Sequence, residues 1–222
     1  MTRSFIAAWL ALIPLGAWSP AVHEIQTKLA ARMIPSPLAA MLHSQREALL
    51  ESARGLPSDE APTLEDVRAQ YLRIRRVSGA HPTPRRLAVE LGLLGHLVQT
   101  LTDPGATRGM TPLREAFTAF ADENLGKLVL TRAPVWAKDG GFDLGPHLEA
   151  WVREKSERHQ RILEQFDQAN GARLGDWGEL SIPFAQLQLS FCSGVHATAN
   201  LWILLWREVG DLWPVPAESP AR

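Results

Sequence analysis

The 222-residue sequence has one cysteine, one tyrosine and no excess of charge of either sign. Because a single cysteine cannot pair within the chain, Cys192 excludes an internal disulfide and any metal site built from several cysteines. The formal net charge of −1 gives no argument for a nucleic-acid or acidic-membrane partner. A metal site in this chain would therefore use histidine, carboxylate and backbone groups.

The sequence also lacks the apolar–polar alternation of strands, internal repeats and a glycine-rich phosphate-binding loop. Instead, apolar residues recur at three- and four-residue steps, and prolines separate these periodic segments. Helices are expected over residues 21–33, 38–54, from 63 onward, 86–104, 112–128, 144–166 and 180–209. We predict an all-α, single-domain bundle of six or seven helices over residues 18–212, followed by a flexible tail at 213–222.

The N-terminal residues 1–17 are typical of a secretory signal peptide, with Arg3, an apolar run over 5–15 and a small-residue end at Gly16-Ala17. The run is shorter than the roughly 20 residues of a membrane span. The alternative is an uncleaved helix that is buried or anchors the chain. Cleavage after Ala17 predicts a periplasmic or extracellular protein that begins with Trp18 and has no transmembrane segment.

The expected central helix carries a polar stripe on an otherwise apolar sequence. His96, Gln99, Thr100 and Asp103 are spaced so that they share one face. Such a stripe either lines a cavity or forms a structural hydrogen-bonded seam. On the last helix His196 and Asn200 also share a face, and they are candidates to complete a buried network with the stripe.

The order of polar motifs along the chain resembles that of a known family. Trp18 precedes His23, Asp59 lies in a Pro-Ser-Asp loop, the sequence 96–104 reads His-Leu-Val-Gln-Thr-Leu-Thr-Asp-Pro, and His147 follows a proline at a helix start. This order resembles the zinc-dependent phospholipase C family, which shares its all-α fold with the single-strand-specific zinc nucleases. The resemblance implies that the free amine and carbonyl of Trp18 bind zinc with His23, and that Asp59 bridges two zinc ions.

The family's motifs are incomplete in this chain. His96 and Pro104 match the core-helix pattern, but Thr100 stands where that pattern has an aspartate and Ala106 where it has a second histidine. His147 matches the later helix, where Trp151 replaces the acid. The resemblance thus implies fewer zinc ions than the family's usual set, with the following residues as ligands: Trp18, His23, Asp59, His96 and His147.

Two functions of different classes follow. The first is a divergent, secreted zinc-dependent phosphodiester hydrolase with reduced or lost activity, in which Asp59 orients a zinc-bound water and the substrate is a phospholipid or a nucleic acid. The second is a metal-free binding or scaffold protein that keeps the fold without catalysis. Trp18 and His23 favour the first, whereas Thr100 and Trp151 favour the second. In both cases the chain is expected to be a monomer.

Overall fold

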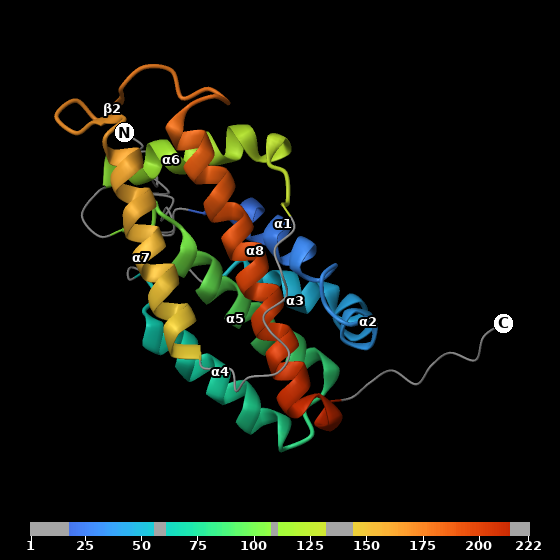
Figure 1. Cartoon of the computed structure of the whole chain (residues 1–222). Coiled ribbons are helices and arrows are strands. Elements are labelled where there is room, and N and C mark those ends of the chain that lie inside the picture. Colours follow the sequence, from blue (N-terminus) through green and yellow to red (C-terminus); the bar gives the residue numbers. More distant parts are fainter. Residues whose placement is uncertain (1–17, 56–60, 108–110, 132–143, 214–222) are drawn as a thin grey trace, which may run out of the picture.

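A computed structural model describes residues 18–55, 61–107, 111–131 and 144–213. The predicted leader (1–17), Asp59 and the tail from residue 214 lie outside these ranges. Within them the chain forms eight α-helices, and the predicted all-α class is confirmed (Figure 1). The helices are α1 (Pro20–Ala30), α2 (Ser36–Ser44), α3 (Arg46–Ala53), α4 (Leu64–Ser78), α5 (Pro84–Thr102), α6 (Thr111–Asn124), α7 (Leu144–Leu163) and α8 (Ile182–Val209).

Two local features differ from the sequence prediction. The expected helix over 38–54 is divided into α2 and α3 because Gln45 leaves the helical region, with φ −115° and ψ 25°. The helix expected over 144–166 ends at Leu163, and two short antiparallel strands that were not expected follow it, β1 (Phe166–Asp167) and β2 (Ala172–Arg173). Two 3₁₀ turns, η1 (Leu125–Lys127) and η2 (Gly210–Leu212), extend α6 and α8.

Helix starts follow from local sequence chemistry. Thr63 and Asp66 form a reciprocal capping box at α4, in which each side chain accepts a hydrogen bond from the other's backbone. Ser19 and Ser181 cap α1 and α8 through their own hydroxyls, each with a proline in the first helical turn. The first turn of α1 is therefore fixed directly after Trp18.

Helix α5 lies in the middle of the bundle, where it packs mainly on α3, α4 and α8 (Figure 1). Its apolar stripe is completely buried, and α8 presents an apolar face to it. By length and composition Ile182–Leu212 could cross a membrane, but 78% of its apolar window is buried inside the fold. That burial is typical of the core helix of a bundle. The buried stripe of α5 is Leu87, Leu91, Leu94 and Val98.

Glycine allows two of these contacts to be unusually close. A Cβ atom at Gly92 would lie 2.0 Å from the Ser52 hydroxyl and 2.5 Å from the Leu49 carbonyl, so α5 approaches the backbone of α3 directly. On α8, a Cβ at Gly194 would lie 2.5 Å from the side-chain nitrogen of Gln26. A side chain at Gly92 would push α5 away from the α3 backbone, whereas one at Gly194 would displace the Gln26 amide of α1.

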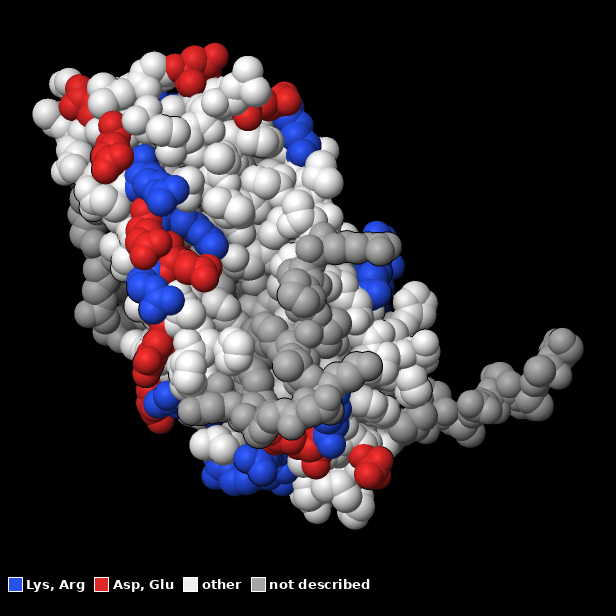
Figure 2. All heavy atoms as spheres, in the orientation of Figure 1, with Lys and Arg blue, Asp and Glu red and all other residues white. Residues whose placement is uncertain are grey.

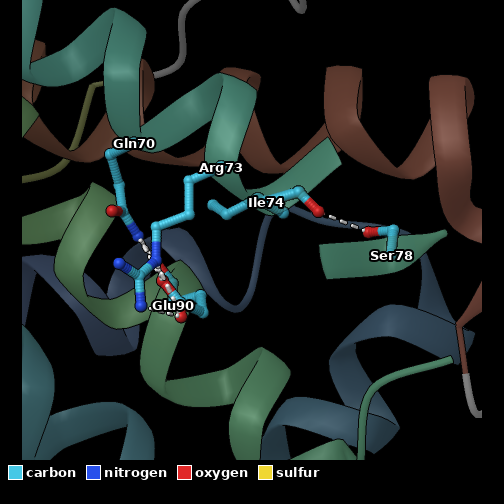
Figure 3. Close-up of polar contacts among 5 residues, drawn as sticks. All are labelled: Gln70, Arg73, Ile74, Ser78 and Glu90. Carbon is cyan, nitrogen blue, oxygen red and sulfur yellow. Dashed lines mark hydrogen bonds and ion pairs between the residues drawn. The ribbon is translucent and has the colours of Figure 1, made fainter. Parts of the chain in front are cut away.

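The α4 side of α5 carries a cluster of charged and polar groups (Figure 3). The guanidinium of Arg73 donates to both carboxylate oxygens of Glu90, and Gln70 donates to the same carboxylate and to the Glu90 carbonyl. At the end of α4, Ser78 donates to the Ile74 carbonyl and accepts a 2.7 Å hydrogen bond from the buried Trp213 indole. The C-terminal end of the fold is thereby joined to α4.

On the face shown in Figure 2, acidic and basic side chains alternate along α7. Glu154 and Arg158 form an ion pair one helical turn apart. Charges of both signs therefore share this face of the bundle.

Candidate functional site

In the predicted polar stripe of α5, Gln99, Thr100 and Asp103 are buried and His96 is partly buried. Among them, Gln99 makes the most hydrogen bonds to other elements. The Gln99 side-chain nitrogen donates to the hydroxyls of Thr27 (3.1 Å) and Thr198 (3.3 Å), and its side-chain oxygen lies 2.8 Å from Nδ1 of His23. The Gln99 carbonyl accepts from the Trp18 indole (3.2 Å) and the Thr102 hydroxyl. One side chain thus connects α1, α5 and α8 through a buried hydrogen-bonded seam, as one of the two sequence alternatives predicts.

Two of the predicted metal ligands, His23 on α1 and His96 on α5, lie side by side. Their ring centroids are 4.5 Å apart and the ring planes are inclined by 47°. Nδ1 of His96 lies 3.1 Å from the Ala53 carbonyl, which can only accept, so Nδ1 carries the proton. The Thr198 hydroxyl donates to the Gly194 carbonyl and accepts from Gln99, which makes the Gln99 oxygen the acceptor for His23 Nδ1. In both rings Nε2 is therefore the nitrogen with the lone pair.

Both imidazoles are neutral at physiological pH. Burial, together with the neighbouring His96, lowers the pKa of His23 to about 3, and the bond to Gln99 acts in the opposite direction. Burial also lowers the pKa of His96, opposed by the Ala53 carbonyl. A neutral imidazole with its Nδ1 proton held by a protein oxygen is the form that ligates metal through Nε2.

The turn after α3 rests directly on the His96 ring. Gly55 has φ +73°, and a Cβ there would lie only 2.3 to 2.6 Å from three atoms of the imidazole. Asp59, the predicted catalytic and bridging residue, lies outside the described residues. It follows Gly55 by four positions in the sequence. The described turn at Gly55, which precedes Asp59 in the sequence, thus lies against one ring of the histidine pair.

Trp18 contacts α5 nearer to the C-terminal end of the helix than His96. Its side chain is buried, and its backbone N–H is a hydrogen-bond donor that lowers the pKa of the Asp103 carboxyl. Asp103 follows His96 by seven residues, which corresponds to about 10 Å along the helix. Burial raises the pKa of Asp103 to about 7, while the N–H of Gly105, the charge of Lys155 and the N–H of Trp18 act in the opposite direction.

His147 lies in the first turn of α7. At the other end of α7, His159 contacts the Pro104 carbonyl just beyond the end of α5. Twelve residues separate the two α7 histidines, or about 18 Å along the helix. In the described ranges no group of three or more His, Cys, Asp or Glu side chains could hold a metal ion.

The fit to zinc is therefore partial. A catalytic zinc needs about three protein ligands, and the described residues bring two imidazoles together. Thr100 uses its hydroxyl to donate to the His96 carbonyl, and Trp151 is a buried apolar residue of α7, so neither position supplies the missing acid. Asp59 is the remaining candidate for a third ligand.

On α8, the residue that bonds to Gln99 is Thr198, which the sequence analysis did not select. His196, two residues earlier, lies roughly 200° away around the helix. The sequence did contain a signal for Thr198: Gly194 lies one helical turn before it. A small residue at that spacing from a hydroxyl indicates a close contact between helices. Thr27 on α1, one turn after His23, could have been found by the same spacing.

Comparison with known proteins gave no match to any protein family, curated protein or solved structure. The resemblance to the zinc-dependent phospholipase C family thus remains a prediction from the motifs.

Proposed function

We propose that the protein is a divergent, exported zinc-dependent phosphodiester hydrolase with a reduced site, in which His23, His96 and Asp59 would hold one zinc ion. The observation that supports it is the adjacent pair of neutral imidazoles, each with Nδ1 bonded to a protein oxygen. This arrangement orients Nε2 as a ligand, because metal-binding histidines donate their other N–H to a carbonyl or carboxylate.

The residues around the pair have separate tasks in this proposal. Gln99 and the Ala53 carbonyl fix the two ring orientations, and Gly55 prevents the His96 ring from turning. Bound zinc would supply a water molecule of lowered pKa and polarise a phosphoryl oxygen. Asp59 would complete the ligand set and orient that water. With Thr100 in place of the aspartate of the core-helix pattern, a single ion is expected rather than the family's cluster.

A specific observation favours the second candidate, a metal-free binding or scaffold protein. The polar side-chain atoms and the carbonyl of Gln99 are all bonded to protein groups, from Trp18 and His23 through Thr27 to Thr198. A fully bonded buried network rigidifies a core without any ion. The histidine pair would then be part of the packing between α1, α3 and α5.

Zinc content of the exported protein separates the two candidates. We expect close to one zinc per chain by plasma mass spectrometry, together with hydrolysis of bis(p-nitrophenyl) phosphate that a chelator abolishes and added zinc restores. His96→Ala and Asp59→Asn should each lower both quantities, whereas His43→Ala, at an exposed position of α2, should lower neither.

Folding is followed in parallel by circular dichroism, so that loss of zinc is distinguished from unfolding. A folded wild-type chain without zinc and without hydrolysis contradicts the proposal and leaves the metal-free candidate.

A further inference from the structure

The buried carboxylate of Asp103 faces the residue that the sequence predicts as the mature N-terminus. We propose that hydrolysis of the Ala17–Trp18 bond frees an α-ammonium group that forms a buried ion pair with Asp103, so that processing completes the attachment of α1 to α5. The inference rests on the proposed export and cleavage, and it is independent of zinc binding and hydrolase activity.

Asp103 lacks a full set of partners in the described structure. Its side chain is 0% exposed, and one carboxylate oxygen accepts a 2.8 Å hydrogen bond from the Gly105 N–H. The other oxygen, Oδ2, has no hydrogen-bond partner among the described residues. The nearby ammonium of Lys155 donates instead to the Ala106 carbonyl, at 2.7 Å. Buried carboxylates are normally paired with a cation or with several donors, so a donor is missing here.

Trp18 is held so that its backbone nitrogen stays at this carboxylate. The indole donates to the Gln99 carbonyl, one turn before Asp103 on α5, and packs on the ring of Phe117 with centroids 6.0 Å apart. Directly after it, Ser19 caps α1 and donates to Asp122 of α6. With its side chain and the following residue both fixed, Trp18 has little freedom to move its nitrogen away from Asp103.

Cleavage changes the chemistry of that nitrogen. Before it, the amide nitrogen of Trp18 carries one N–H and no charge. A leader-cleaving peptidase adds water across the bond: hydroxide goes to the carbonyl carbon of Ala17, and Trp18 keeps the electron pair and takes protons to become an ammonium. The product has three N–H donors and a positive charge. One N–H can keep the present contact with the Asp103 carboxyl while another donates to Oδ2 of Asp103.

The assignment differs from the role that the family resemblance gives to Trp18. There the free amine binds zinc together with His23. In this chain the Trp18 nitrogen faces Asp103, about two helical turns of α5 away from the level of His96. The substitution of Thr100 for the family's acid leaves Asp103 as the buried carboxylate of this helix end.

The test starts from full-length protein that has been exported and purified, whose first residue is read by mass spectrometry. We expect Trp18, and a different first residue overturns the proposal. The α-amine of this product is then labelled with an acylating reagent under native and urea-unfolded conditions. Native protein should label far more slowly, and Asp103→Asn should raise the native rate about tenfold or more, because the charge that retains the amine is gone.

Asp122→Asn is the matched control. It removes a carboxylate of α6, beside the start of α1, that accepts a hydrogen bond from the Ser19 hydroxyl rather than from the amine. It should leave the α-amine protected. A chelator should also leave it protected, and labelling that rises with the chelator but not with Asp103→Asn assigns the amine to a metal and refutes the ion pair.

If Asp103→Asn does not fold, a second variant still decides the question. One glycine inserted before Trp18 turns its nitrogen back into an amide and preserves every side chain. The melting temperature should fall by several degrees relative to the Trp18-first protein. An unchanged melting temperature contradicts the proposal.

Discussion

Helix α5 carries two polar clusters, one charged and partly exposed, the other buried and mostly neutral. Near its start, Glu90 is a nearly buried carboxylate that pairs with Arg73 (Figure 3). The Arg73 side chain is 57% exposed, so water reaches one side of the pair. Near its end, the seam around Gln99 is buried throughout and uses mostly neutral groups. The comparison indicates that the first cluster contributes little to stability, whereas each member of the second is needed.

The largest destabilisation by a substitution is expected for Gln99→Leu, which removes the centre of the buried seam. It leaves His23 Nδ1 and the Thr27 hydroxyl without their partner, and unpaired buried groups are costly. We expect the free energy of unfolding, measured with urea, to fall by about 3 kcal/mol. Gln160→Leu, on the exposed face of α7, is the control and should change it by less than about 0.5 kcal/mol. Equal effects would remove the distinction between seam and surface.

In a chain whose Trp18 nitrogen is still an amide, the pH dependence of the free energy of unfolding should show the contribution of Asp103 separately from that of its neighbours. Its pKa is raised to about 7 in the folded state from 3.8, so the folded state binds the proton more tightly. Stability from this group is present at acid pH and is lost as pH rises between about 4 and 7.

Between pH 4 and pH 8 the free energy of unfolding should therefore fall by about 4 kcal/mol through Asp103, and Asp103→Asn should abolish this fall, as measured by urea unfolding of both proteins. The lowered pKa of His23 acts with the opposite sign, because its contribution is lost as pH falls below 6.5, and it cancels in the comparison. Parallel pH profiles for the two variants would contradict this interpretation of Asp103.

Gly55→Ala tests whether the turn above the histidine pair is rigid. The substitution combines the strain of φ +73° with a direct clash on the His96 ring, and should lower the free energy of unfolding by about 2 kcal/mol. Gly175→Ala has the same φ of +73° but open space around the new methyl group. It should cost about 1 kcal/mol, and the difference between the two variants measures the contact with His96.

The smallest effect is expected at the half-exposed cluster. A double-mutant cycle of Arg73→Ala and Glu90→Gln should give a coupling free energy of about 1 kcal/mol or less, decreasing as salt is added. A coupling as large as the loss expected for Gln99→Leu, or one insensitive to salt, would show that exposure of Arg73 does not weaken the pair.

The helices were predictable because burial imposes a periodic pattern, and Leu87, Leu91, Leu94 and Val98 mark α5 in the sequence as clearly as in the fold. The polar stripe was predictable for the same reason. The partners of that stripe were not, since Thr198 faces Gln99 only because of how α8 is rotated against α5. The proximity of Trp18 to Asp103 also depends on the assembled bundle, because Asp103 follows Trp18 by 85 positions in the chain.

The multiple bonds of Gln99 restrict how related sequences can vary. A residue whose amide meets a histidine and two threonines from other helices cannot change alone without leaving a buried group unbonded. Replacement by an apolar residue should therefore occur together with changes at 23, 27 and 198. Descendants of this chain should be recognisable by coordinated substitution at these four positions, even where overall identity has faded.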